Sequence, residues 1–222
     1  MLSLGPYGAT MIPGQEYTGA YDSSHSTISQ LRDWHLERIR AFVSLGKGRD
    51  WDVEEEEVKE KRECWELVDL VAFETLPLLR EVLAVQEVML QFSSALGEKE
   101  MNPFWISCVF PGSANTLPDG SSIKDVVKAM LGKREGCATP MGIGLNCTKI
   151  GKLEGLIEEF EREVNGMMER GELGEEQWPA LVVYPDGTNG EVYNTATKVW
   201  EKNEMGVQGG VRITYFACRR IW

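Results

Sequence analysis

The chain has 222 residues, of which 42% are hydrophobic and 26% are charged, and this size and composition suit one soluble globular domain. Its 35 acidic and 23 basic residues give a formal net charge of −12. Because such a field repels nucleic acids and anionic membrane surfaces, we expect neither of them as a partner.

The chain shows no targeting or membrane signal that we can recognise. Residues 1–14 lack a basic region and a long apolar core, so we expect no signal peptide, and no run of about 18 apolar residues predicts a membrane span. An odd number of scattered cysteines does not form a secreted disulfide framework: Cys64, Cys108, Cys137, Cys147 and Cys218. We therefore expect a cytoplasmic protein whose thiols are free for metal binding or catalysis.

Short apolar runs alternate with amphipathic stretches along the chain. A stub of a strand is expected at Leu2–Leu4, and five continuous apolar runs are expected to be strands: 68–73, 104–110, 142–147, 180–184 and 211–216. Continuous apolar runs are typical of strands buried on both faces of a parallel sheet. Helical periodicity marks four segments between the runs: 26–45, 78–96, 123–131 and 153–168.

This alternation predicts a parallel α/β fold, either a barrel or a doubly wound sheet. No G-x-G-x-x-G motif follows a strand, which leaves dinucleotide binding with little support. A complete eight-stranded barrel takes about 250 residues. The five runs and the stub therefore predict an incomplete barrel, with about six of the eight strands present. The charge-rich segment 47–63 predicts an acidic surface insertion.

Three residues lie at the carboxyl ends of predicted strands, where parallel α/β folds bind ligands. Each has an alternative interpretation. Glu74 precedes Pro77 and suits a helix N-terminus, Cys147 suits a small buried apolar position, and Cys218 suits a thiol near a frayed end. Taken singly, none of the three identifies a site.

Several segments together carry a more specific pattern. They are 5–9 (GPYGA), 16–19 (EYTG), 34–35 (WH), 72–75 (AFET), 104–107 (FWIS), 142–148 (GIGLNCT), 184–186 (YPD) and 190–193 (GEVY). In their order and spacing, from residue 2 to about residue 213, these segments resemble the homocysteine S-methyltransferase family.

The resemblance implies a zinc-dependent enzyme on a (β/α)8 barrel of the TIM type. One cysteine on the sixth strand and an adjacent pair in a Gly-Gly-Cys-Cys-Arg motif hold the zinc; Cys147 matches the first and Cys218 one of the pair. The open metal position takes the sulfur of homocysteine as a thiolate, which accepts a methyl group from S-methylmethionine or S-adenosylmethionine to give methionine. Glu74 and Asn146 match positions that contact homocysteine, and no side chain is assigned a separate catalytic role.

The sequence departs from the family pattern at two places. The family's first two strands, with an Asp-Gly-Gly segment, precede the motif at 5–9, whereas Met1 stands four residues before Gly5. Tyr215, Phe216 and Ala217 stand where two glycines and the first paired cysteine are expected. We therefore expect a partial barrel that binds zinc weakly. The alternative is a non-catalytic barrel remnant that binds a partner or has no function.

Two histidines complete the inventory of residues able to bind metal or transfer protons. His25 and His35 both fall by the first predicted helix, and we expect structural roles for both rather than metal ligation.

Overall fold

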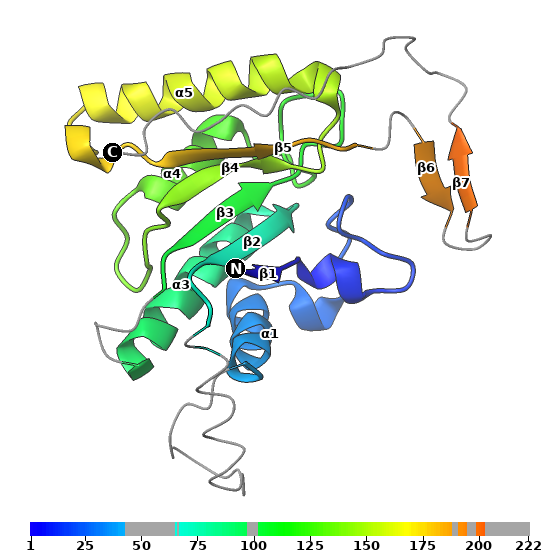
Figure 1. The fold of residues 1–222 in the computed structure, drawn as a ribbon, viewed down its shortest axis with the longest axis horizontal. Coiled ribbons are helices and arrows are strands. Elements are labelled where there is room, and N and C mark those ends of the chain that lie inside the picture. Colours follow the sequence, from blue (N-terminus) through cyan, green and yellow to red (C-terminus); the bar gives the residue numbers. More distant parts are fainter. Residues whose placement is uncertain (43–64, 66, 97–101, 188–190, 195–198, 203–222) are drawn as a thin grey trace, which may run out of the picture.

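The computed structural model describes residues 1–42, 65, 67–96, 102–187, 191–194 and 199–202 (Figure 1). Five parallel strands form one sheet in the order β1-β2-β3-β4-β5. They are β1 (Leu2–Leu4), β2 (Val71–Leu76), β3 (Phe104–Cys108), β4 (Gly142–Asn146) and β5 (Ala180–Tyr184). The expected parallel α/β class is confirmed. The strand order follows the chain order without the reversal that defines a doubly wound sheet.

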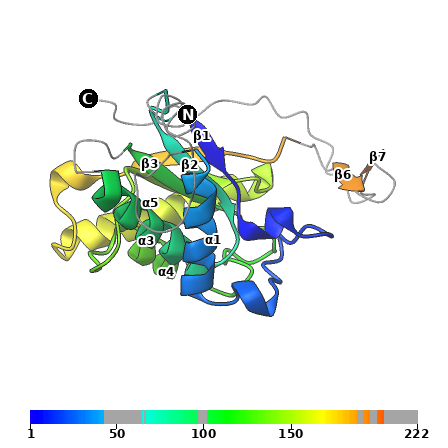
Figure 2. The ribbon, with the colours of Figure 1, turned by 90° about the horizontal axis from the view of Figure 1, so that it is seen from below.

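Four α-helices lie on one side of this sheet, as Figure 2 shows. They are α1 (Ile28–Arg40), α3 (Leu79–Leu96), α4 (Ile123–Leu131) and α5 (Leu153–Glu169). Two of them begin at capping boxes: Thr27 accepts from the Gln30 N–H before α1, and Ser122 accepts from the Asp125 N–H before α4. Short 3-10 helices occupy four connections: η1 (Tyr7–Thr10), η2 (Ser23–His25), η3 (Ile150–Lys152) and η4 (Glu175–Gln177).

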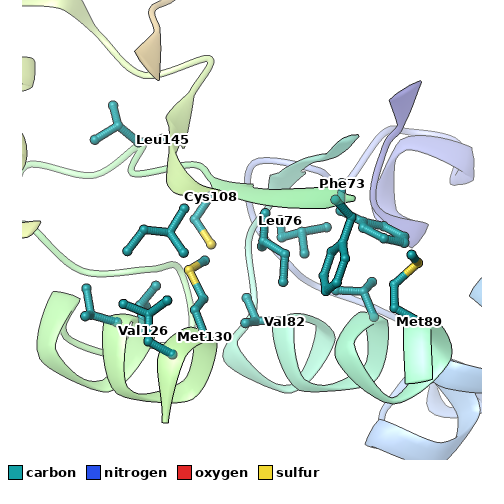
Figure 3. Packing of buried hydrophobic residues seen from close by; sticks show 14 of the residues in the cluster. Phe73, Leu76, Val82, Met89, Cys108, Val126, Met130 and Leu145 are labelled. Atoms are coloured by element: carbon teal, nitrogen blue, oxygen red, sulfur yellow. The ribbon is translucent and has the colours of Figure 1, made fainter. Parts of the chain in front are cut away.

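The apolar core fills the space between the sheet and the helices. Strand side chains meet helix side chains from α3 and α4, as Figure 3 shows for Phe73, Leu76, Val82, Met89, Cys108, Val126, Met130 and Leu145. Burial of such side chains stabilises a domain by about 1.5–3 kcal/mol each, which makes this layer the main source of stability. The side chains on the face of the sheet that contacts the helices therefore belong to the core.

Most predicted elements occur close to their expected positions. The stub at Leu2–Leu4 is a strand paired with β2, and the helix expected at 123–131 has those bounds. The run expected at 68–73 lies three residues too early, because β2 spans Val71–Leu76. The strand expected at 211–216 and the insertion at 47–63 lie outside the described residues.

A hairpin was not predicted from the sequence. Strands β6 (Glu191–Asn194) and β7 (Val199–Lys202) pair antiparallel in a separate two-stranded sheet. From the sequence, no strand was expected between the runs at 180–184 and 211–216. None of the described helices is long and apolar enough to cross a membrane.

Candidate functional site

The ends of β2 and β4 meet at the carboxyl edge of the sheet. Thr75 lies near the end of β2, and its Oγ1 donates to the Sγ of Cys147, the residue directly after β4, across 3.6 Å. Both residues have left-handed backbones, with φ of 61° at Thr75 and 48° at Cys147. Such values are unusual for residues other than glycine, and for a β-branched threonine they mark strain of the kind that clusters at functional sites.

An irregularity in the sheet register produces this geometry on β2. Phe73 is opposite Ile106 and Leu76 is opposite Cys108, so β2 uses one residue more than β3 between these pairs. Glu74 and Thr75 fall in this bulge. Bulges bend a strand and re-aim side chains, and they are over-represented next to active sites.

Asn146 joins the two strand ends. Its side chain is only 1% exposed, and its Oδ1 accepts from the Thr75 N–H at 2.8 Å. Its Nδ2 donates to Thr75 Oγ1 at 2.7 Å and to Cys147 Sγ at 3.2 Å. The backbone N–H of Cys147 donates to the Tyr184 carbonyl at 3.1 Å. The sulfur of Cys147 is thus fixed in position by neighbours from β2, β4 and β5.

We expect Asn146→Ala to lower the free energy of unfolding by about 2 kcal/mol, because it removes the acceptor of the Thr75 N–H and both donors to Thr75 and Cys147. Urea denaturation measures the change. Asn115→Ala is the matched control, since the Asn115 side chain donates to Glu159 in a half-buried position and its loss should cost less than about 0.5 kcal/mol. Equal losses in both variants would show that Asn146 is no more important than an ordinary surface amide.

Three polar side chains from different strands gather beside this edge: Glu74 on β2, Ser107 on β3 and Tyr184 on β5. Ser107 Oγ on β3 and Tyr184 OH on β5 are 2.8 Å apart and share a hydrogen bond. Burial raises the pKa of the Tyr184 phenol, and the nearby Glu74 carboxylate raises it further. Since Tyr184 is also opposite Asn146 in the β4–β5 register, Glu74 and Cys147 lie on the same edge of the sheet.

Tyr17 reaches this edge from the segment between β1 and α1. Burial raises the pKa of its phenol, and Cys147 and Asp186, both close to the hydroxyl group, raise it further. The side chain still keeps 44% of its surface exposed, so it covers Cys147 only in part. Sequence reasoning did not assign Tyr17 to the site. The available signal was its position in the motif at 16–19.

The comparison with known families decides what this site belongs to. The sequence profile described as "Homocysteine S-methyltransferase" matches residues 1–216. The chain belongs to the homocysteine S-methyltransferase family.

Individual relatives agree with this assignment. Homocysteine S-methyltransferase 2 of Arabidopsis thaliana is 28% identical over 202 residues, which cover 90% of this chain and 46% of the relative. Homocysteine S-methyltransferase 1 of Zea mays is 29% identical over 198 residues, covering 89% of this chain and 46% of the relative. The chain thus spans about half the length of the curated relatives that it matches.

A solved structure supports the fold. The chain is similar to the metallated form of the homocysteine methyltransferase MmuM from Escherichia coli, with a TM-score of 0.51 and 24% identity. The match covers 84% of this chain and 48% of MmuM.

The structure brings together three of the four site residues that were predicted from the sequence. Glu74, Asn146 and Cys147 share the carboxyl edge, whereas Cys218 lies outside the described residues. Of the other thiols, Cys108 is buried on the helix side of β3 (Figure 3), and burial raises the pKa of its thiol. Cys137 is half-buried after α4, and Cys64 is not described.

Cys147 fits a metal ligand by its place and exposure. It is half-buried at the ligand-binding edge, and the donors Asn146 Nδ2 and Thr75 Oγ1 fix its sulfur. Among the described residues, no group of three or more histidine, cysteine, aspartate or glutamate side chains could hold a metal ion. Of the three thiols in the described part of the chain, Cys147 is the one at this edge, and a zinc site needs further donors.

Proposed function

We propose that this chain supplies the homocysteine-binding site of a homocysteine S-methyltransferase. The observation that carries the proposal is the fixed Cys147 thiol on the same edge as the Glu74 carboxylate, in a chain whose residues 1–216 match the family. The scaffold in this proposal is the family's (β/α)8 barrel. Parallel strands in chain order with all described helices on one face are what part of such a barrel presents.

Glu74 is proposed to hold the ammonium group of homocysteine. It lies beside Phe73, which packs into the core, so its carboxylate points to the opposite face of the sheet. Tyr184 and Ser107 form the adjoining polar surface. Asn146 belongs to the same site, and because its amide is bonded to Thr75 and Cys147, it acts there by fixing the position of the sulfur.

Zinc is the proposed metal, with Cys147 and Cys218 as ligands. When bound, zinc supplies the Lewis acidity that lets a thiol lose its proton at neutral pH. Ala217 offers no donor where the family pattern has a cysteine, so we propose weak binding. The sulfur donors of this site favour zinc over the hard, oxygen-preferring Mg²⁺ or Ca²⁺.

The proposed reaction transfers a methyl group between two sulfur atoms. The thiol of homocysteine loses its proton, and its sulfur attacks the methyl carbon of a sulfonium donor, S-methylmethionine or S-adenosylmethionine. The bond from that carbon to the donor sulfur breaks, and its electron pair leaves a neutral thioether. Methionine is the product. The residues of this chain orient the acceptor, and the proposed location is the cytoplasm.

Calorimetric titration of the chain with homocysteine, in the presence of excess zinc, tests the assignment of Glu74. Glu74→Gln should raise the Kd about tenfold or more, because it removes the charge that faces the substrate ammonium. Glu87→Gln is the matched control. Glu87 is on α3 and pairs with Arg32 and Arg134, away from the site, so the Kd should not change. The same Kd for both variants and the unaltered chain would contradict the proposal.

A further inference from the structure

Tyr17 lies in a segment that is tightly folded on itself. The Gly19 N–H donates to the Gln15 carbonyl at 2.8 Å, which closes a turn around Tyr17, and the Gln15 N–H donates to the Gly8 carbonyl at 2.8 Å. A Cβ on Gly8 would lie only 2.6 Å from the backbone carbon of Gln15. The backbone atoms of Gly8 and Gln15 therefore pack closely against each other, and the segment forms a compact turn.

A buried carboxylate on α3 holds both sides of this segment. Glu81 is fully buried, and its Oε1 accepts from the Tyr7 N–H at 2.8 Å while its Oε2 accepts from the Tyr21 hydroxyl at 2.5 Å. Tyr7 precedes Tyr17 in the segment and Tyr21 follows it. One side chain of α3 therefore fixes the two flanks of the turn that carries Tyr17.

A third donor to the same carboxylate comes from α1. His35 is fully buried, and its Nε2 is 3.0 Å from Glu81 Oε1. Its Nδ1 has no hydrogen-bond partner among the described residues, and burial lowers the pKa of the ring, so the neutral ring donates through Nε2. Three donors converge on one carboxylate, and such charge-assisted bonds are about twice as strong as neutral ones.

A contact with the residue before α3 adds to these bonds. Gly19 has a φ of +64°, and a Cβ placed on it would lie 2.4 Å from Cδ2 of the buried Leu78. Leu78 lies between β2, which ends at Leu76, and α3, whose first turn contains Glu81. The segment is thus held by the same stretch of chain that places Glu74 and Thr75.

We propose that Glu81 is a positioning residue of the Cys147 site: its carboxylate anchors Tyr7 and Tyr21 and so holds Tyr17 against the Cys147 sulfur. Glu81 does not touch the sulfur itself and acts through Tyr17. Any effect of Glu81 on methyl transfer rests on the proposed function, whereas its placement of Tyr17 does not. Tyr17 then restricts the access of reagents to the Cys147 sulfur.

The accessibility of the Cys147 thiol tests this proposal without zinc or substrate. Alkylation by iodoacetamide is followed at each cysteine by peptide mass spectrometry. Tyr21→Phe removes one hydroxyl from the anchor and should speed alkylation of Cys147 about tenfold, as expected for losing one hydrogen bond to a charged group. Cys108 is the internal reference, because it is fully buried in the core and its rate should not change.

A double-variant cycle separates positioning from a general loss of stability. Tyr17→Ala should speed alkylation directly, and adding Tyr21→Phe to it should give no further increase, because both act through the same side chain. Ser122→Ala, which removes the cap of α4 and none of the hydrogen bonds to Glu81, should lower the melting temperature without changing the alkylation of Cys147. An unchanged rate in Tyr21→Phe, or effects that multiply in the double variant, would overturn the proposal.

Discussion

The 222-residue chain is expected to bind less than one equivalent of zinc and to form no measurable methionine from homocysteine with either sulfonium donor. In the proposed ligand set, Ala217 stands in place of one of three thiolates, which removes both a bond and a charge. Loss of a ligand should weaken zinc affinity at least as much as loss of a residue that hydrogen-bonds to a ligand, which typically costs about 10–100-fold. A thiol without zinc keeps a pKa of about 8.5 and is mostly protonated at pH 7. Metal analysis and a methionine assay measure the two outcomes.

Restoring the family pattern should reverse both results. The restored chain carries Tyr215→Gly, Phe216→Gly and Ala217→Cys. The glycines matter because a backbone without side chains can pass close to metal and substrate. Stoichiometric zinc in the unrestored chain would contradict the ligand assignment.

Gly144→Ala should lower the free energy of unfolding by about 3 kcal/mol or more, or prevent folding. An added Cβ would lie 1.8 Å from the carbonyl oxygen of Val182 and 2.7 Å from its carbonyl carbon. Both atoms belong to the backbone of β5, so the clash cannot be relieved by a rotamer change. The β4–β5 pairing that carries Asn146 and Cys147 would have to shift. Thermal and urea denaturation, with circular dichroism, measure the loss.

Gly151→Ala is the matched control for this prediction. Gly151 lies in η3, and a Cβ there meets nothing within 4 Å. The substitution should change stability by less than about 0.5 kcal/mol. Similar behaviour of the two alanine variants would show that β4 and β5 tolerate a wider separation than the structure indicates.

Local patterns predicted the fold best where the decisive interactions are also local. The helix at 123–131 begins at the Ser122–Asp125 capping box, and both residues are readable in the sequence. The hairpin of β6 and β7 was missed because its strands are four residues each, which is too short for a periodic pattern. The end of β2 was misplaced because the bulge at Glu74 and Thr75 extends the strand past its apolar run.

The candidate site was predictable only in part, for a similar reason. Glu74, Asn146 and Cys147 follow apolar runs, and the carboxyl ends of parallel strands share one edge, so their proximity could be expected. The hydrogen bonds that join Thr75 to Asn146 and to the sulfur of Cys147 connect residues 71 and 72 positions apart, and no pattern in the sequence specifies them. The approach of Tyr17 to Cys147 depends on the buried Glu81, whose partners come from two other segments.

Methionine formation by the restored chain, before and after Cys147→Ala, tests the central claim most directly. If homocysteine is activated at Cys147, the restored chain converts homocysteine and a sulfonium donor to methionine, and Cys147→Ala abolishes conversion together with stoichiometric zinc. Cys137→Ala, which removes a half-buried thiol outside the site, leaves both intact. Conversion that persists in Cys147→Ala would contradict the account.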